Sequence, residues 1–323
     1  MKNHKSIELN DDQLVFRFPE VHCDAMVAIE FQRTLRIPDD NRSHHLPPGL
    51  GRFPLSRVDD YPDNMPDKWM QHGGVFLPMY QAEALWINLR GGYPMAVKIA
   101  AGKVNAVTSE AWKEGLSAEP QDYFVVPDQP WLDGFCVEKG LVRQFVAMPL
   151  GKGYTAEEQL TGEAEHGGLQ ISVYPMKRTV YERQLEMVQN RIAEVCCSVP
   201  GMGLAPGGLM RQEIYQDKHG IDAWETTAGS RCYVHIVNSV QFFYLTGCEP
   251  PGKPQTAQDY TGPWYDYTDN ELKVLAGAKE LAGLDSVASV KLKKGEGFLP
   301  DNDPVTPKVV KKLNRSMVRE GVF

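Results

Sequence analysis

Residues 94–108 read PMAVKIAAGKVNAVT and contain two short apolar runs on either side of an Ala-Gly pair. In both runs apolar residues alternate with polar ones, which are Lys98 in the first run and Lys103 and Asn105 in the second. Side chains of a β-strand point alternately to the two faces of a sheet, so this pattern predicts two strands. The Ala101-Gly102 pair supplies the turn, because glycine adopts a positive φ without strain. Residues 94–108 are therefore predicted to form a β-hairpin.

Further strands are expected on both sides of this hairpin. Short apolar runs recur along the chain between turn-forming residues, and the chain holds 29 glycines and 23 prolines. Frequent glycine and proline residues favour strands and loops over long helices. Residues 248–267 are rich in proline, glycine and aromatic residues, which is typical of a long ordered loop held against the core. The expected strands are 14–18, 25–35, 122–126, 141–148, 169–174, 209–215, 221–225 and 232–237.

Two segments have the periodicity of a helix. Apolar residues recur at three- and four-residue steps between Thr179 and Cys197, and Pro200-Gly201 follows as a stop signal. Thr306-Pro307 places an N-cap hydroxyl and a first-turn proline before an apolar stripe that runs to Met317. The predicted fold class is α+β: strand-rich, with mostly antiparallel sheets and long ordered loops, one mid-chain helix and a helical C-terminal region. The predicted division is a strand-rich body, residues 1–270, and a helical, basic region, residues 271–323.

Charge and composition exclude several classes of protein. The chain has 34 Lys and Arg against 42 Asp and Glu, a formal net charge of −8, so nucleic acid is not an expected partner. The sequence predicts neither a signal peptide nor a membrane-spanning run of apolar residues, and we expect a cytoplasmic location. The six cysteines form no CxxC pair, and the histidines have no ligand spacing, so no metal is predicted. His44-His45 is expected in a solvated loop.

Glycine-rich segments suggest no cofactor. Gly151-Lys152-Gly153 lacks the spacing of a phosphate-binding P-loop. The segment 201–208 follows a helical pattern and precedes a strand, which is the reverse of a dinucleotide-binding arrangement. Both are interpreted as structural turns, and no cofactor is predicted. Nucleophilic catalysis has no support either, because the chain contains no GxSxG elbow and no cysteine in a recognisable catalytic context.

A polar stripe gives the first candidate site. Alternation in the strand expected at 209–215 places Arg211, Glu213 and Tyr215 on one face. Arg143 and His235 interrupt two other apolar runs. Buried charges must be paired, so Arg143, Arg211, Glu213 and His235 are expected to converge in one pocket. The alternative is an edge strand with a solvated face and a core histidine that is satisfied by one partner.

Two loops supply further candidates. The segment 162–168 reads GEAEHGG, and its terminal glycines suit a hinged loop in which Glu165 and His166 supply a general acid or base. Such a loop is also commonly just exposed. In the loop 129–135, Trp131 and Asp133 suit either ligand contact or ordinary anchoring. Exposed rings of Trp131 and Trp264 would suit a sugar or another flat ligand.

Several stretches resemble a group of uncharacterised bacterial proteins of similar length. They are RIPDD (36–40), LPPGLGRFPL (46–55), QPWLDGF (129–135), RQFVAMPLGKGYTAEEQLTGEAEHGGLQI (143–171), GLAPGGLMRQEIY (203–215) and RCYVHIVNS (231–239). The resemblance spans most of the chain, and it implies a single integrated architecture. It implies no activity and assigns no catalytic residue.

Two functions are compatible with these patterns. The first is a binding or self-assembly protein that uses its ordered loops and a basic C-terminal tail, since the last 33 residues carry eight Lys and Arg against four Asp and Glu. In that case residues 306–323 would dock on a neighbouring copy, which makes a homo-oligomer, or on an acidic partner. The second is a metal-independent enzyme with Glu213 or His235 as general base, Arg143 and Arg211 holding an anionic group, and the Glu165-His166 loop as lid.

Overall fold

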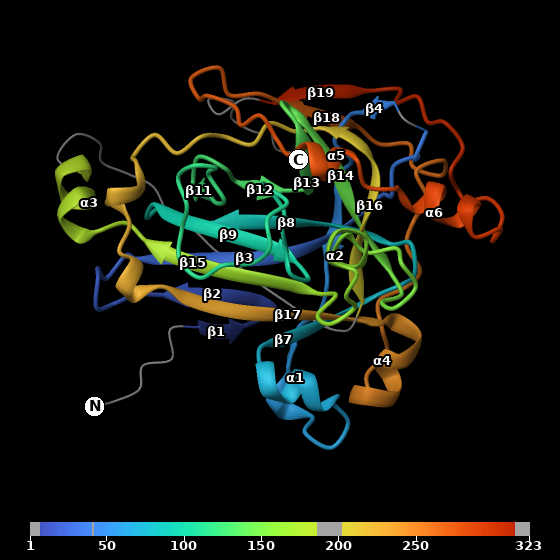
Figure 1. Cartoon of the computed structure of the whole chain (residues 1–323), viewed down its shortest axis with the longest axis horizontal. Helices are drawn as coiled ribbons and strands as arrows, with labels where there is room; N and C mark the ends of the chain where they lie inside the picture. The colour runs from blue at the N-terminus through green and yellow to red at the C-terminus, as the bar shows by residue number, and fades with distance from the viewer. Residues whose placement is uncertain (1–6, 41, 186–201, 314–323) are drawn as a thin grey trace, which may run out of the picture.

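The computed structural model describes residues 7–40, 42–185 and 202–313. Most of them belong to two large β-sheets whose inner faces contribute to one hydrophobic core. Figure 1 shows the strands of both sheets running through the centre of the molecule, with most of the short helices toward its edges. Strand-rich architecture with few helices is therefore confirmed, and the pairs are mostly antiparallel, as the sequence predicted.

The larger sheet has ten strands, and its antiparallel pairing follows the alternation of apolar residues. Only the pairing of β16 with β4 is parallel. Its main path is β1 (Ile7–Asn10), β2 (Gln13–Arg17), β3 (Met26–Thr34), β8 (Ala84–Arg90), β14 (Leu141–Met148), β16 (Gly203–Arg211) and β4 (Ser43–His44). Off this path, β5 (Gly49–Arg52) pairs with β3, β12 (Trp131–Leu132) with β8, and β13 (Gly134–Glu138) with β14.

The second sheet has seven strands and contains the hairpin predicted at residues 94–108. Its path is β10 (Val104–Asn105), β9 (Met95–Ala101), β15 (Leu169–Pro175), β17 (Ser230–Asn238), β7 (Val75–Met79) and β6 (Ser56–Arg57), with β11 (Phe124–Val126) on β9. The pairing of β17 with β7 is parallel. β9 and β15 are buried along their whole length, because loops cover the face that does not contact the main core.

Lys98 shows how closely that outer face is covered. Although lysine is usually exposed, this side chain is 2% exposed. The ammonium group lies 2.5 Å from the Asp122 carboxylate and donates to the carbonyl oxygens of Lys113 and Gly115. The segment 109–122 therefore packs on the sheet through a fully satisfied buried ion pair.

The helices are short and stand at the ends of strands. They are α1 (Asp67–His72), α2 (Ala156–Thr161), α3 (Arg178–Leu185), α4 (Ser239–Thr246), α5 (Lys279–Ala282) and α6 (Val287–Lys293), with single 3-10 turns η1 (Val58–Asp60), η2 (Ile221–Ala223) and η3 (Thr226–Ala228). Among the described residues no helix has the length and apolar character needed to cross a membrane. The helix predicted at 179–197 begins as α3, and its second half lies outside the described residues.

Three predicted elements are wrong. The turn expected at 201–208 is the strand β16 from Gly203 onward, and a Cβ at its Gly207 would collide with Val146 of β14, so this glycine serves close packing between strands. The return strand expected at 221–225 is the 3-10 turn η2, which starts after Gly220 at φ 81°. In the described part of the helix expected from Thr306, residues 310–313 are instead β19 (Val310–Leu313), a strand that pairs in parallel with β18 (Trp264–Tyr267). Here the β-branched pair Val309-Val310 and a hydrogen bond from the Trp264 N–H to the Val309 carbonyl override a local capping signal. The part of that predicted helix after residue 313 lies outside the described residues.

The region after residue 270 is helical only in part. α5 and α6 are the helical portion, and Leu281 and Leu284 belong to the main core. Val287 and Val290 of α6 form a smaller core with residues of β14 and β16, including Met148 and Ala205. The packed body therefore continues past the boundary expected at residue 270.

Candidate functional site

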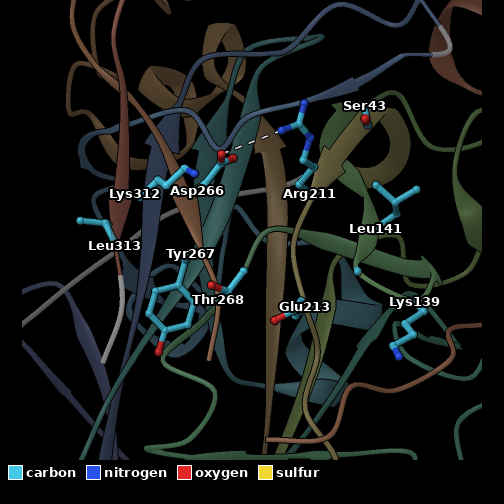
Figure 2. A pocket seen from close by; sticks show the side chains of 11 residues that line it. Ser43, Lys139, Leu141, Arg211, Glu213, Asp266, Tyr267, Thr268, Lys312 and Leu313 are labelled. Atoms are coloured by element: carbon cyan, nitrogen blue, oxygen red, sulfur yellow. Dashed lines mark ion pairs between the residues drawn. The ribbon is translucent and has the colours of Figure 1, made fainter. Parts of the chain in front are cut away.

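A pocket of about 470 Å³ lies where the end of β16 meets the small sheet of β18 and β19. We call it the β16 pocket. Figure 2 shows its side chains arranged around an opening between these strands and the turn that joins β13 to β14. Its lining residues are Ser43, Lys139, Gly140, Leu141, Arg211, Glu213, Asp266, Tyr267, Thr268, Lys312 and Leu313.

Arg211 and Glu213 reach the β16 pocket as the alternation predicted. Arg211 is the last residue of β16 and lies opposite Leu141 of β14, and Glu213 follows on the same side. The Tyr215 hydroxyl donates a hydrogen bond of 3.2 Å to the Glu213 carboxylate. Gly140 lies beside Glu213, and a Cβ at this position would lie 3.9 Å from Glu213 Cγ. Two of the four residues expected to converge are thus together.

Asp266 of β18 is the second carboxylate of the pocket, and it is already paired. His45 Nδ1 lies 2.6 Å from one of its oxygens, and Arg211 lies 3.9 Å from the other. His44 is 8% exposed, and its Nε2 lies 2.8 Å from Asp40. The expectation that His44-His45 is simply a solvated loop is therefore wrong, because both imidazoles bind carboxylates.

Lys139 and Lys312 give the β16 pocket its positive character. Both are exposed, and neither forms an ion pair with any acidic residue that the structure describes. Lys139 comes from the turn between β13 and β14, whereas Lys312 comes from β19, in register with Asp266. With Arg211 they place three cations around two carboxylates, one of which is already engaged by His45 and Arg211.

Arg143 lies outside the β16 pocket although it belongs to the same face of the sheet. Its guanidinium is turned toward Gly207, whose carbonyl oxygen it approaches to 3.4 Å. Burial lowers the pKa of Arg143, and the carboxylates of Asp39 and Asp285 oppose that shift. Its Nε has no hydrogen-bond partner among the described residues.

His235 lies in the other sheet. Its Nε2–H donates to the Gly73 carbonyl at 3.0 Å, and its ring stacks on Trp69 at 4.5 Å. Burial lowers the pKa of His235 to about 4, so the imidazole is neutral near pH 7. The structure thus places it as a core histidine satisfied by one partner, the alternative that the sequence left open. The expected convergence of Arg143, Arg211, Glu213 and His235 in one pocket is not found.

His166 approaches His235 instead. With His72 and Tyr233 the two form what we call the histidine cluster, in which the His72 ring lies 5.0 Å from His166 and 4.5 Å from Tyr233. Burial lowers the pKa of both His72 and His166. This cluster joins the end of α1, the loop 162–168 and β17.

Glu165 lies at the border of the histidine cluster and is bound mainly by Lys103. Lys103 Nζ lies 2.5 Å from both Glu163 and Glu165, and this hydrogen bonding lowers the pKa of Glu165. His166 Nε2 is 3.8 Å from the Glu165 carboxylate. The loop 162–168 therefore closes over the seven-stranded sheet, whereas the β16 pocket lies elsewhere.

Trp131 and Asp133 are anchoring residues. The Asp133 carboxylate accepts a 2.6 Å hydrogen bond from Gln212, and burial raises the pKa of Asp133 to about 7. The Trp131 ring packs edge-on against Tyr267 at 4.8 Å. Trp264 is 1% exposed and offers no ring to a ligand. These observations support the loop-packing alternative for both aromatic loops.

Sequence reasoning did not identify Lys139, Asp266 or Lys312. Lys139-Gly140 predicts the turn between β13 and β14, but no neighbouring sequence pattern indicates that this turn lines a pocket. β18 and β19 are separated by more than forty residues, and their parallel pairing leaves no local pattern. No protein-family model matches the chain, and neither a curated protein nor a solved structure matches it. The resemblance to a bacterial group stays a prediction.

Proposed function

We propose that this chain is a cytoplasmic binding protein whose β16 pocket takes a small molecule with a carboxylate or phosphate group. The observation that carries the proposal is the position of Lys139 and Lys312 on the pocket wall with no described acidic partner. An anionic group placed between them and Arg211 would form charge-assisted hydrogen bonds. The basic C-terminal segment would then serve the site, since β19 contributes both Lys312 and Leu313.

The rest of the pocket suits the polar part of such a ligand. Ser43 and Thr268 present hydroxyl groups, and Glu213 has acceptor capacity beyond the bond from Tyr215. Tyr267 and Leu313 add apolar surface. A pocket of about 470 Å³ has the size of ordinary metabolite sites. We therefore propose a ligand with hydroxyl or amino groups in addition to its negative charge.

The test uses neighbouring lysines of β19. Lys312 lines the pocket, whereas Lys311 is equally charged and exposed but does not line it. We expect citrate or inorganic phosphate to bind the full chain in isothermal titration calorimetry, and Lys312→Ala to weaken binding by about 5- to 30-fold, the loss of one charge-assisted contact. Lys139→Ala should act similarly.

Lys311→Ala is the matched control and should bind like the unaltered chain. If neither anion binds, or if Lys311→Ala and Lys312→Ala weaken binding equally, the ligand is not held in the β16 pocket. Raising the salt concentration should weaken binding, because the lysines are exposed and their field is screened.

A second candidate function is acid–base catalysis in the same pocket without a metal. Glu213 favours it, since this carboxylate is not engaged in an ion pair with another pocket residue and stands beside Arg211. Glu213 would take a proton from a substrate whose anionic group Arg211 holds. Glu213→Gln should keep anion binding and abolish any turnover detected by proton NMR of bound anions. A variant that retains turnover would refute the catalytic role.

The partner proposal concerns residues 306–323. The described part of this segment includes β19, whose outer edge pairs with no other described strand, and Val309 and Val310 are 49% and 36% exposed. Lys308, Lys311 and Lys312 make the same surface basic. We propose that it docks on the acidic surface of a second copy of this chain or of another acidic protein.

A further inference from the structure

The turn between β2 and β3 brings three potential metal ligands together. Its backbone is closed by hydrogen bonds from the Phe18 N–H to the Ala25 carbonyl and from the Ala25 N–H to the His22 carbonyl, at 2.8 and 3.0 Å. His22, Cys23 and Asp24 are thus the first three positions of a tight turn. Their side chains project from one short and well-bonded piece of backbone.

The donor atoms of these residues have the spacing of a coordination site. His22 Nδ1 lies 3.8 Å from Cys23 Sγ and 3.7 Å from Asp24 Oδ2. Cys23 Sγ lies 3.8 Å from Asp24 Oδ1. Zinc bonds of about 2.0–2.3 Å at a tetrahedral angle separate two ligand atoms by roughly 3.5 Å. Within the described residues this is the group of three such side chains whose donor atoms lie within 4.8 Å of one another.

The imidazole is held in place from outside the turn. The His22 ring stacks on Tyr93 at 5.5 Å and meets the edge of Tyr181, a residue of α3, at 5.1 Å. Its side chain is 12% exposed, whereas that of Asp24 is 66% exposed. One ligand is therefore fixed by packing, and the other two can adjust to an ion.

A hydrogen bond already directs one nitrogen of the imidazole toward the turn. The Asp24 N–H donates to His22 Nδ1 at 3.1 Å, so the lone pair of Nδ1 points toward the backbone of the turn. An incoming ion would take the place of this single donor.

We propose that His22, Cys23 and Asp24 form a binding site for a divalent metal ion of borderline softness, and for zinc in particular. The set of one nitrogen, one sulfur and one oxygen donor suits zinc better than magnesium or calcium, which prefer oxygen alone. A thiolate and a carboxylate balance the charge of the ion. Three protein ligands leave a fourth position for water or another molecule, as in zinc sites that are open. The site is separate from the β16 pocket, and it stands or falls independently of the proposed function.

The sequence did not suggest this site because its ligands are consecutive. Zinc patterns are recognised from paired cysteines and histidines at spacings of two to five residues. His22-Cys23-Asp24 has no such spacing. The turn, and the tyrosines that hold the imidazole, come from separate parts of the chain.

The test titrates zinc into the metal-free full chain against a chromogenic chelator. Cys196, Cys197 and Cys248 are first replaced by serine, which removes the other thiols except the buried Cys136 and Cys232. We expect one equivalent of zinc to bind. Cys23→Ser and Asp24→Asn, both on exposed side chains, should each weaken binding on the order of tenfold or more.

Two further measurements identify the ligands. Binding should release a proton from the Cys23 thiol, a release that Cys23→Ser abolishes. Cobalt, used as a coloured substitute, should show a thiolate-to-metal charge-transfer band that also disappears in Cys23→Ser. His45→Gln, at a histidine far along the chain that already binds Asp266, is the matched control and should leave zinc affinity unchanged.

The outcomes separate the alternatives. If the serine background takes up no zinc, or if zinc affinity survives both Cys23→Ser and Asp24→Asn, the proposal is wrong. A circular dichroism spectrum that matches the unaltered chain shows that a lost affinity does not come from unfolding. The anion-binding test on Lys312 is unaffected by either result.

Discussion

His235 shows at the residue scale how strongly its surroundings determine its chemistry. It was a candidate general base in the sequence, yet the structure gives it one carbonyl partner, Gly73, and the face of Trp69. The nearest charged and titratable groups around it include His72 and His166, both of which disfavour a further positive charge. Its chemistry is therefore that of a neutral hydrogen-bond donor inside a packed layer.

This burial makes stability depend on pH. The pKa of His235 falls from 6.5 to about 4 on folding, so between these values the unfolded chain binds a proton that the folded chain does not. Stability is therefore expected to fall as the pH drops below 6.5, by on the order of 1 kcal/mol per pH unit from this residue. Urea unfolding at several pH values, followed by tryptophan fluorescence, measures the effect.

His235→Gln is the informative variant. Glutamine keeps a donor for the Gly73 carbonyl but does not titrate. We expect the free energy of unfolding of this variant to fall less steeply between pH 6.5 and 4. Profiles of equal slope for the two proteins would mean that His235 is not the residue responsible.

At the scale of elements, β19 contrasts with the buried central strands of the large sheets. It has four residues, pairs along one edge only, and leaves Val310 to Lys312 exposed. β9, by contrast, is buried along its whole length and has partners on both sides. Local opening of β19 should therefore cost much less free energy than opening of β9.

Hydrogen exchange measures this difference. We expect the amides of residues 310–313 to exchange by local opening, much faster than those of residues 95–101. Citrate or phosphate should slow exchange in β19, because Lys312 and Leu313 line the pocket that the anion occupies. Exchange in β9 serves as the internal control. An anion that slows β9 and β19 equally would indicate general stabilisation rather than contact with β19.

The elements also show what a sequence can reveal. Alternation predicted β14 at its observed bounds and placed Arg211 and Glu213 on one side, since antiparallel strands with one polar face carry that pattern locally. Capping residues at Thr306-Pro307 predicted a helix, whereas residues 310–313 form a strand. The strand forms because the Trp264 N–H donates a hydrogen bond to the Val309 carbonyl. The two residues are far apart in the sequence, so local sequence patterns do not reveal this contact.

For the molecule as a whole, the distribution of charge matters more than any pair. The net charge is −8, and removing the last 33 residues, which hold eight basic and four acidic side chains, leaves −12. The C-terminal segment is thus a basic surface attached to an acidic body. Attraction between such surfaces on different copies acts within a Debye length of about 8 Å at physiological salt.

Association should therefore depend on salt. Light scattering at low salt is expected to give a molar mass above the 36.2 kDa of one chain, and the mass should fall as salt is added. Lys308→Glu combined with Lys311→Glu reverses two charges outside the β16 pocket and should abolish association. A mass of one chain at every salt concentration would refute docking on a second copy of this chain.

The whole molecule also explains why the site was only half predictable. Its two large sheets are mostly antiparallel, and their strands could be read individually from alternation. The β16 pocket, however, requires that β16 lie beside β18 and β19. These strands are held there by a β-bridge between Leu46 and Tyr265, a contact between residues that are far apart in the sequence. His166 and His235 were assigned to one site with Glu213, but they lie on β17 and its covering loop.

The buried pair of Lys98 and Asp122 has an evolutionary consequence. The ammonium group has three acceptors and almost no exposure. Replacing Lys98 alone would leave the buried Asp122 carboxylate without its ion-pair partner, and the free energy of unfolding would fall by about 3–5 kcal/mol. Replacing Asp122 alone would leave the buried ammonium group without its carboxylate partner. Substitutions at positions 98 and 122 are therefore expected to occur together, and a related sequence in which only one has changed should carry a rebuilt 109–122 segment.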